Sequence, residues 1–271
     1  MVRRSIATSI VEGKISVLDN DRMRQAAELL LKARREVMPI HELPGNLRPN
    51  TLEEAYGLQD IMAQSLSPIG GWKVGAPTPD ATPVFSAMPL WGGFAASGDR
   101  IASAFRRLRG VEAEIAFCMG KDLPRRAEPY TREEVIDAIQ SAHPAIELLE
   151  SAYFDVDKVD RFSLLGDLQM NGGFARGAAV ANWQNCDLAK ETVSVTIDGK
   201  KIFEGTASNP AGTDLIRLVT WLANEGSYRT VGLKSGQWIT TGSWSGKALA
   251  KAGSKVEARF SHFGAVTLTF D

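Results

Sequence analysis

Two glutamates separated by one residue stand in an otherwise apolar segment, Val111-Glu112-Ala113-Glu114-Ile115. The segment is typical of a β-strand, in which alternate side chains share one face and the Cα atoms of residues i and i+2 lie about 6.7 Å apart. Glu112 and Glu114 would then project together while their apolar neighbours face a core. Such a pair either belongs to a solvated strand face or converges on a ligand, and its neighbours must decide between the two.

A third glutamate, Glu147, interrupts the apolar segment Pro144-Ala145-Ile146-Glu147-Leu148-Leu149. Because burial of an unpaired carboxylate is costly, Glu147 needs a proton, a cationic partner or a metal ion. Three carboxylates match the oxygen preference of hard divalent ions such as Mg²⁺ or Mn²⁺. The alternative is an ion pair between Glu147 and an arginine such as Arg106 or Arg109.

Two further segments place polar side chains beside glycines. Lys73 lies in Gly71-Trp72-Lys73-Val74-Gly75, where its ammonium needs an anionic partner unless the side chain reaches the surface. Asp167 is another acid among apolar residues, and it precedes Asn171-Gly172-Gly173. The glycine pair leaves the Asn171 side chain free to bind a ligand, although turn chemistry explains this asparagine nearly as well.

Other chemistries lack their motifs. His41, His143 and His262 stand alone, so a zinc site of histidines and cysteines is not supported. Gly242-Ser243-Trp244-Ser245-Gly246 carries tryptophan where a nucleophile elbow requires serine. The sequence contains neither a Walker-type loop nor a dinucleotide-binding fingerprint. The candidate chemistry is therefore that of the carboxylates.

The first third of the chain is expected to be helical. A stripe at three- and four-residue spacing predicts an amphipathic helix from Asp19 to about Val37, with Met23, Ala26, Ala27 and Leu30 on its apolar face. Thr51 and Glu54 fit a capping box that opens a helix to about Ser65. The Gly/Pro-rich stretch at 68–83 should not hold regular structure. We therefore divide the chain into an N-terminal helical region, 1–67, and a catalytic domain, 68–271.

Strand signals dominate the second part. Strands are expected at 111–119, 145–149, 237–241, 255–260 and 265–270, and a hairpin between 193–197 and 201–204 through the favoured turn Asp198-Gly199. A capping box at Thr131 and Glu134 predicts a helix as far as Pro144, and another helix is expected over 213–224 with Gly226 as its C-cap. Because no βαβ alternation occurs, the pattern favours an α+β fold with a rolled, barrel-like mixed sheet.

The composition excludes several classes of protein. The 271 residues, 44% hydrophobic and 23% charged, suit one or two globular domains rather than a disordered or fibrous chain. A formal charge of −1 provides no overall field for nucleic acid or an anionic membrane. Cys118 and Cys186 lack a metal-ligand spacing and are expected to be reduced. Since neither a signal peptide nor a membrane span is predicted, we expect a soluble, cytoplasmic protein.

The chain resembles the 2-keto-4-pentenoate hydratase branch of the fumarylacetoacetate hydrolase superfamily from about Leu66 to the C-terminus. The resemblance rests on six motifs in order: GWKVG (71–75), VEAEIAF (111–117), PAIELLES (144–151), GDLQMNGGFARG (166–177), TWLANEG (220–226) and LKSGQWITTGS (233–243). It implies a mixed β-roll of the fumarylacetoacetate hydrolase C-terminal type, preceded by a smaller helical part.

The resemblance also implies roles for individual residues. The expected ligands of Mg²⁺ or Mn²⁺ are Glu112, Glu114 and Glu147. The residues expected to take part in catalysis are Lys73, facing the acidic end of a 2-oxo acid or its enol, and Asp80 and Asp167 as candidates for proton transfer. Substrate contacts are expected from Lys73, Val74, Asn171, Gly172 and Thr241. The segment between GWKVG and Asp80 is shorter than in relatives, and Asn171 stands where many members carry serine.

These roles imply a hydratase, a lyase that adds water to 2-hydroxypenta-2,4-dienoate or a close analogue, as in aromatic-ring catabolism. A divalent ion chelated by the C1 carboxylate and the C2 oxygen would stabilise an enolate. A 2-oxo acid decarboxylase of the 4-oxalocrotonate type and a C–C bond acylpyruvate hydrolase remain open, as does a non-catalytic subunit packed against a related enzyme. By analogy we expect a homo-oligomer, and association with a related decarboxylase is a further alternative.

Overall fold

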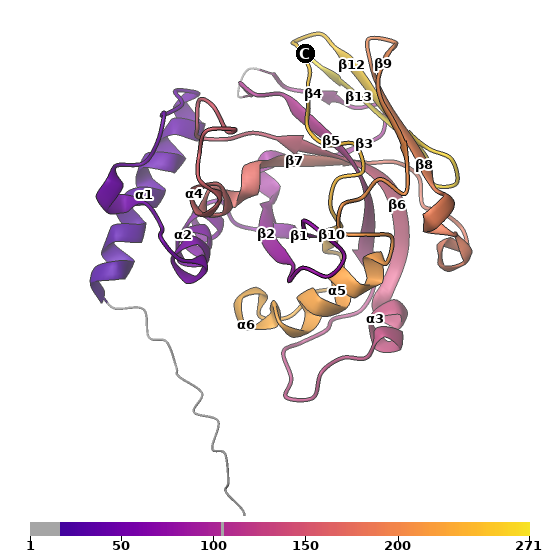
Figure 1. Cartoon of the computed structure of the whole chain (residues 1–271), viewed down its shortest axis with the longest axis horizontal. Coiled ribbons are helices and arrows are strands. Elements are labelled where there is room, and N and C mark those ends of the chain that lie inside the picture. The colour runs from indigo at the N-terminus through magenta and orange to yellow at the C-terminus, as the bar shows by residue number, and fades with distance from the viewer. Residues whose placement is uncertain (1–16, 104–105) are drawn as a thin grey trace, which may run out of the picture.

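The computed structural model describes residues 17–103 and 106–271, which form two β-sheets with helices around them (Figure 1). The helices are α1 (Val17–Glu36), α2 (Leu52–Ser65), α3 (Arg132–Ala138), α4 (Arg161–Gly166), α5 (Leu215–Asn224) and α6 (Ser227–Thr230). The strands are β1 (Ile69–Gly75), β2 (Val84–Pro89), β3 (Phe94–Ala96), β4 (Arg100–Ile101), β5 (Gly110–Met119), β6 (Ile139–Leu149), β7 (Asn171–Arg176), β8 (Thr192–Ile197), β9 (Lys200–Thr206), β10 (Trp238–Thr240), β11 (Ala248–Leu249), β12 (Lys255–Phe260) and β13 (Gly264–Phe270).

The larger sheet has the order β2-β1-β10-β5-β6-β7-β3, with β11 also pairing with β5, and the smaller sheet has the order β4-β13-β12-β8-β9. Both sheets are mixed, because β1 runs parallel to β10 and β4 runs parallel to β13 while most other pairs are antiparallel. Strands far apart in the sequence therefore lie side by side in both sheets. This arrangement confirms the predicted α+β fold with a rolled mixed sheet.

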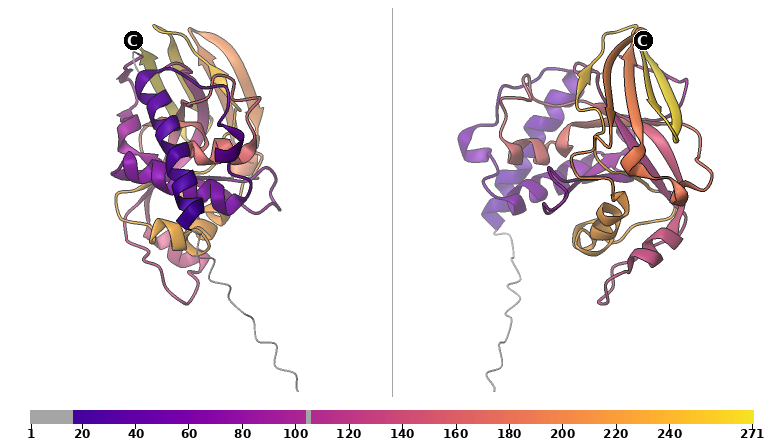
Figure 2. Two further views of the ribbon diagram at one scale, coloured as in Figure 1. Left: turned by 90° about the vertical axis from the view of Figure 1, so that its left-hand side faces the viewer. Right: turned by 45° about the vertical axis from the view of Figure 1, so that its right-hand side comes forward.

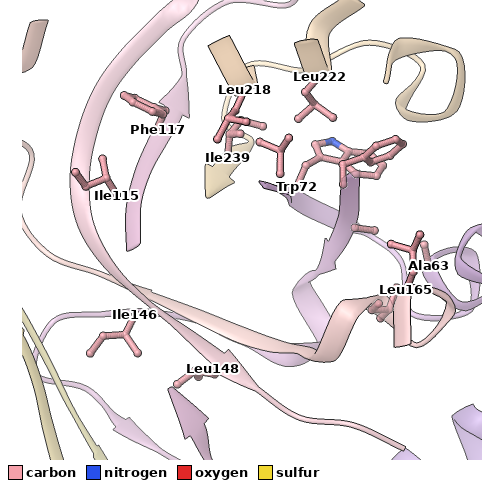
Figure 3. Packing of buried hydrophobic residues seen from close by; sticks show 14 of the residues in the cluster. Ala63, Trp72, Ile115, Phe117, Ile146, Leu148, Leu165, Leu218, Leu222 and Ile239 are labelled. Carbon is pink, nitrogen blue, oxygen red and sulfur yellow. The ribbon is translucent and has the colours of Figure 1, made fainter. Parts of the chain in front are cut away.

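Alternation along β5 decides which side chains enter the core. Val111, Ala113 and Ile115 are each at most 2% exposed and belong to the main apolar cluster, as the sequence predicts. On the neighbouring strands, Trp72 and Ile239 lie beside the apolar face of α5 (Figure 3). The opposite face of β5 is thereby left to the two glutamates.

Helices α1 and α2 lie together on one flank of the molecule, beside α4 and the edge strand β2 (Figures 1 and 2). The predicted stripe on α1 is buried from Met23 to Leu30. Thr51 caps α2 by accepting a hydrogen bond from Glu54 N, but the Glu54 carboxylate accepts from Asn50 N, so the predicted reciprocal box is not closed. None of the described helices has the length and apolar character that a membrane crossing requires.

Three local predictions from the sequence were wrong. The Gly/Pro-rich stretch contains β1, because Gly71 allows the backbone of β10 to approach so closely that a Cβ would meet Trp238 O at 2.0 Å. Helix α3 has the predicted capping box but ends at Ala138, and β6 runs straight through Pro144. Gly226 has φ of −75° and leads directly into α6, so it is not a left-handed C-cap. The hairpin at Asp198-Gly199 is confirmed, with positive φ at both turn residues.

Candidate active site

Three glutamates converge on the face of the larger sheet that points away from the main core. In the antiparallel pairing of β5 with β6, Glu112 lies directly opposite Glu147, and Glu114 follows two residues along the same face of β5. Carboxylate oxygens of the three side chains lie within 4.8 Å of one another. Like charges placed opposite each other across two strands destabilise a sheet unless a cation lies between them. The geometry is therefore that of a cation site.

Lys73 reaches this cluster from β1. Its Nζ lies 2.8 Å from both carboxylate oxygens of Glu147 and donates a hydrogen bond to Oε1 and another, 3.1 Å long, to Gln169 O. Arg106 and Arg109 donate instead to backbone carbonyls. The alternative in which an arginine neutralises Glu147 is therefore not what the structure shows.

The cluster carries an excess of potential negative charge in a buried place. Glu114 is 1% exposed and Glu147 is fully buried. Burial raises the pKa of Glu112 to about 7, partly opposed by the charge of Lys73. Burial and the charge of Glu147 hold the pKa of Glu114 well above its ordinary value. Burial alone would lower the pKa of Lys73, but the charges of Glu147, Glu112 and Glu114 outweigh it and the net shift is upward.

Two carboxylate oxygens of the cluster accept no hydrogen bond from the described residues. Glu114 Oε2 accepts a hydrogen bond from Gly242 N, and Glu147 Oε1 accepts from Asn171 Nδ2 as well as from Lys73. Glu114 Oε1 is buried and has no hydrogen bond to any residue that the structure describes. Glu147 Oε2 is also buried without a hydrogen bond, but it lies 2.8 Å from Lys73 Nζ in the ion pair. A buried acceptor such as Glu114 Oε1 is costly unless a proton or a ligand satisfies it, and an oxygen-only donor set suits a hard divalent cation. The residues present therefore fit a metal ion of that kind.

A cavity of about 320 Å³ opens beside the glutamates. Its lining includes the charged residues Lys73, Glu112 and Glu114 and the neutral polar residues Gln169, Asn209 and Ser243. The remaining wall is apolar and comes mainly from Val74, Ala76, Pro77, Val84 and Pro210. A ligand in this cavity would meet both charged and apolar side chains.

A strained turn borders the cavity. Leu168, Gln169 and Met170 have φ of 55°, 48° and 64°, so three successive residues with a Cβ adopt the left-handed conformation. This conformation costs an L-residue roughly 1–2 kcal/mol, so the turn costs about 3–6 kcal/mol in all. Strain of this kind persists only where surrounding contacts enforce it and is often found at functional sites. Here it places Gln169 O against Lys73 and the Gln169 side chain in the cavity wall.

The other predicted catalytic residues lie differently. Asp167 is fully buried, and its carboxylate accepts from Arg34 Nε, Ser151 Oγ and Ala152 N, which leaves it unsuited to carrying a proton to a substrate. Asp80 is exposed on the loop between β1 and β2 and does not line the cavity, although Pro77 of the same loop does. The structure thus separates two acids that the sequence could not tell apart.

Of the predicted substrate contacts, Lys73 and Val74 line the cavity, whereas Asn171 does not line it and instead donates its amide to Glu147. Thr241 is fully buried and donates its hydroxyl to Ile115 O, so it is held within the sheet. Gly172 lines a different cavity, of about 580 Å³, to which none of the three clustered glutamates contributes. Neither residue lines the cavity beside the glutamates, and their predicted contacts with the substrate stay predictions.

Sequence reasoning missed three residues at this site. Thr240 pairs with Lys73 in the β1–β10 register, so its buried hydroxyl lies on the face that carries Lys73. Asn209 lines the cavity and donates to Thr241 O and Gly242 O, which supports the backbone amide bound to Glu114. No pattern in the sequence pointed to Gln169 as a residue of this site. For Asn209 the dipeptide Asn209-Pro210, a turn signal before a helix, was available.

A rolled mixed sheet with a buried carboxylate cluster beside a lysine defines a class of enzymes rather than a structural module. The family model described as fumarylacetoacetate (FAA) hydrolase C-terminal matches residues 92–271, and the chain belongs to this family. The resemblance stated from the sequence motifs is thereby confirmed.

Individual relatives agree with the family. The 2-keto-4-pentenoate hydratase of Paraburkholderia xenovorans (strain LB400) is 25% identical over 262 residues, 91% of this chain and 94% of the hydratase. A 4-oxalocrotonate decarboxylase of a Pseudomonas species is 25% identical over 164 residues, 59% of each chain. The solved structure of 4-oxalocrotonate decarboxylase from Pseudomonas putida G7, complexed with magnesium and adipate, has a TM-score of 0.80 at 21% identity, covering 93% of this chain and 98% of that one. This last likeness concerns the fold alone.

Proposed function

We propose that the protein is a hydratase that depends on Mg²⁺ or Mn²⁺ and adds water to 2-hydroxypenta-2,4-dienoate (2-oxopent-4-enoate) or a close 2-oxo acid analogue. The observation that carries the proposal is the buried cluster of Glu112, Glu114 and Glu147, in which Glu114 Oε1 accepts no hydrogen bond from the described residues. Similarity to a 2-keto-4-pentenoate hydratase over nine-tenths of the chain supports the reaction, and the magnesium in a protein of the same fold supports the cation.

The three glutamates would hold the cation: Glu114 Oε1 accepts no hydrogen bond from the described residues, and Glu147 Oε2 would be shared between the cation and Lys73. When bound, a divalent cation supplies Lewis-acid stabilisation of negative charge on the substrate oxygens. Lys73 stabilises the ionised form of Glu147 through their 2.8 Å contact, and because it lines the cavity its ammonium can also attract the substrate carboxylate. The Asn171 amide, which donates to Glu147, keeps that carboxylate in place.

Hydration of the substrate adds a hydroxyl group to C4 and a proton to C5 and gives a 4-hydroxy-2-oxo acid. A side chain must move a proton in this step, and positioned acids and bases contribute about 10²–10⁴-fold to rate. Asp167 is excluded by its buried ion pair. We therefore assign proton transfer to Asp80, whose loop contributes Pro77 to the cavity wall.

The lining of the cavity favours a substrate with one carboxylate. Lys73 is the only cationic residue among the described residues that line it, and the lining residues other than Lys73, Glu112 and Glu114 are neutral. A second carboxylate would be desolvated without a cationic partner, which is costly. This favours 2-oxopent-4-enoate over the dicarboxylate 4-oxalocrotonate.

Decarboxylation of the 4-oxalocrotonate type is the second candidate, supported by the decarboxylase similarity and the shared fold. The purified protein should be assayed with 2-hydroxypenta-2,4-dienoate, 4-oxalocrotonate and an acylpyruvate, each with Mg²⁺, with Mn²⁺ and with excess chelator. We expect loss of the dienol absorbance and a hydrated product from the first substrate only, abolished by chelator and restored by the cation. Release of CO₂, cleavage into two acids, or turnover that chelator does not affect would refute the proposal.

The homo-oligomer, the association with a decarboxylase and the cytoplasmic location stay predictions.

A further inference from the structure

Arg34 brings a buried charge from the N-terminal helix into the catalytic domain. It continues the apolar stripe of α1 one turn beyond Leu30, yet it is only 4% exposed. Its guanidinium donates from Nε to Asp167 Oδ1 (2.6 Å) and from Nη2 to Asp167 O (2.8 Å). It also donates from Nη1 to Asn171 O (2.9 Å) and from Nη2 to Glu150 O (3.0 Å). All three guanidinium nitrogens are therefore used in one rigid fork, a geometry that lysine cannot reproduce.

These contacts enclose the left-handed turn Leu168–Met170. Asp167 precedes the turn and Asn171 follows it, so Arg34 binds the backbone at both ends. Glu150 N donates to Met170 O (2.9 Å), and this ties the turn to the end of β6, where Arg34 binds Glu150 O. Three successive non-glycine residues in the left-handed conformation need surrounding contacts to keep that conformation. The hydrogen bonds of the Arg34 guanidinium supply such contacts.

The same turn contacts the candidate site at two points. Gln169 O accepts from Lys73 Nζ (3.1 Å), and Asn171 Nδ2 donates to Glu147 Oε1 (2.9 Å). Lys73 and Glu147 are the ion pair of the cluster. Relaxation of the turn would therefore displace a partner of the ammonium and a partner of the carboxylate together.

We propose that Arg34 is a positioning residue of the active site: with Asp167 as its counter-ion, it holds the left-handed turn closed and so fixes Lys73 and Glu147 for cation binding. Asp167 then acts through Arg34 and not through the substrate. The inference rests on the proposed cation site. It makes the helix α1, which contributes no residue to the cavity wall, a requirement for the site.

The test compares Arg34→Lys with the wild-type chain. Lysine keeps the charge beside Asp167 but loses the fork across the turn. We expect Mg²⁺ or Mn²⁺ affinity, measured by calorimetry, to fall about 10–100-fold, the range usual for residues that orient metal ligands. We also expect faster backbone hydrogen exchange at 167–172. Leu30→Ala is the matched control, because it weakens the packing of the same helix one turn away and should leave the cation affinity within about twofold of wild type.

A second variant separates positioning from simple anchoring of α1. Met170→Gly removes left-handed strain, because glycine adopts positive φ without penalty. If Arg34 works by holding the turn, Met170→Gly combined with Arg34→Lys should recover part of the lost affinity, whereas an anchoring role predicts additive effects. Should Arg34→Lys alone not fold, the comparison is made in the Met170→Gly background.

The outcomes are distinct from those that test the reaction. Unchanged cation affinity and unchanged exchange at 167–172 in Arg34→Lys would overturn the positioning role, as would additivity with Met170→Gly. A wild-type chain that binds neither cation would overturn the proposed function, and the exchange at 167–172 would still decide whether Arg34 holds the turn.

Discussion

Replacing Glu112 with glutamine should stabilise the cation-free protein while it removes the response to the cation. Burial raises the pKa of Glu112 from the ordinary 4.5 to about 7, so the folded chain disfavours the charged form. The folded state then holds a proton that the unfolded chain has lost, and stability falls as pH rises from 4.5 through 7. Above pH 7 the full cost is present, and glutamine avoids it.

The magnitude follows from the same shift. The rise in the pKa of Glu112 from 4.5 to about 7 corresponds to a cost of about 3 kcal/mol for the charged form in the folded state, since one pKa unit is worth about 1.36 kcal/mol. Because Glu112 is only partly buried in the sheet, solvent reduces the cost, and we expect about 1–3 kcal/mol of stabilisation at pH 8. For a chain of this size each kcal/mol raises the melting temperature by about 2–4 °C.

Thermal unfolding of wild type and Glu112→Gln at pH 5 and pH 8, with and without Mg²⁺, measures both effects. Saturating Mg²⁺ at one hundred times its Kd should add about 2.7 kcal/mol to the wild type and little to the variant. At pH 5 the stabilising effect of the substitution should largely vanish. Glu128→Gln, at an exposed position, is the control and should change stability by less than about 0.5 kcal/mol. A destabilised Glu112→Gln at pH 8, or one that keeps the full Mg²⁺ response, would refute the reasoning.

Three further predictions concern the same site. Lys73→Met leaves the fully buried Glu147 without the ammonium that pairs with it. We expect the free energy of unfolding to fall by about 3–5 kcal/mol, measured by denaturant titration without metal. A loss below about 1 kcal/mol would contradict a buried ion pair. Asp80→Asn should reduce kcat at least about 10²-fold and leave the calorimetric affinity for Mg²⁺ unchanged, and a normal kcat would remove Asp80 from the mechanism. Mg²⁺ affinity should fall as pH drops below 7, because the raised pKa of Glu112 leaves a proton on this carboxylate that the cation must displace; equal affinities at pH 6 and pH 8 would be inconsistent with that shift.

The parts of the fold that could be predicted from the sequence are those with local causes. The period of two in Val111 to Ile115 placed the glutamates on one face, and Asp198-Gly199 defined a hairpin, because each depends only on neighbouring residues. Strand β1 could not be found in this way. Its parallel partner β10 lies about 170 residues further along the chain, and the glycines that signal a loop are what permits the close approach.

The roles of the acidic residues also differ in whether they depend on neighbouring or on distant residues. The motifs pointed to Glu112, Glu114 and Glu147 together, but nothing local distinguishes Asp167 from them, because its partner Arg34 is 133 residues away. A signal for that pair was nevertheless present. Arg34 falls four residues after Leu30 on the apolar stripe of the first helix, and a charge at a position that must be buried requires a counter-ion elsewhere in the chain.

The energetics of the site argue that it is kept for function rather than for stability. The larger sheet sets Glu112 opposite Glu147, buries Glu114 beside them, and provides Lys73 as the one cation in the cavity wall among the residues described. A neighbouring turn adopts a conformation that its residues disfavour. Apolar replacements of the charged residues would relieve repulsion and desolvation, and glycines in the turn would relieve its strain, so folding alone gives no reason for this arrangement. A cation bound by all three carboxylates would remove the repulsion and satisfy Glu114 Oε1, and the chain would then be more stable with its ligand than without it.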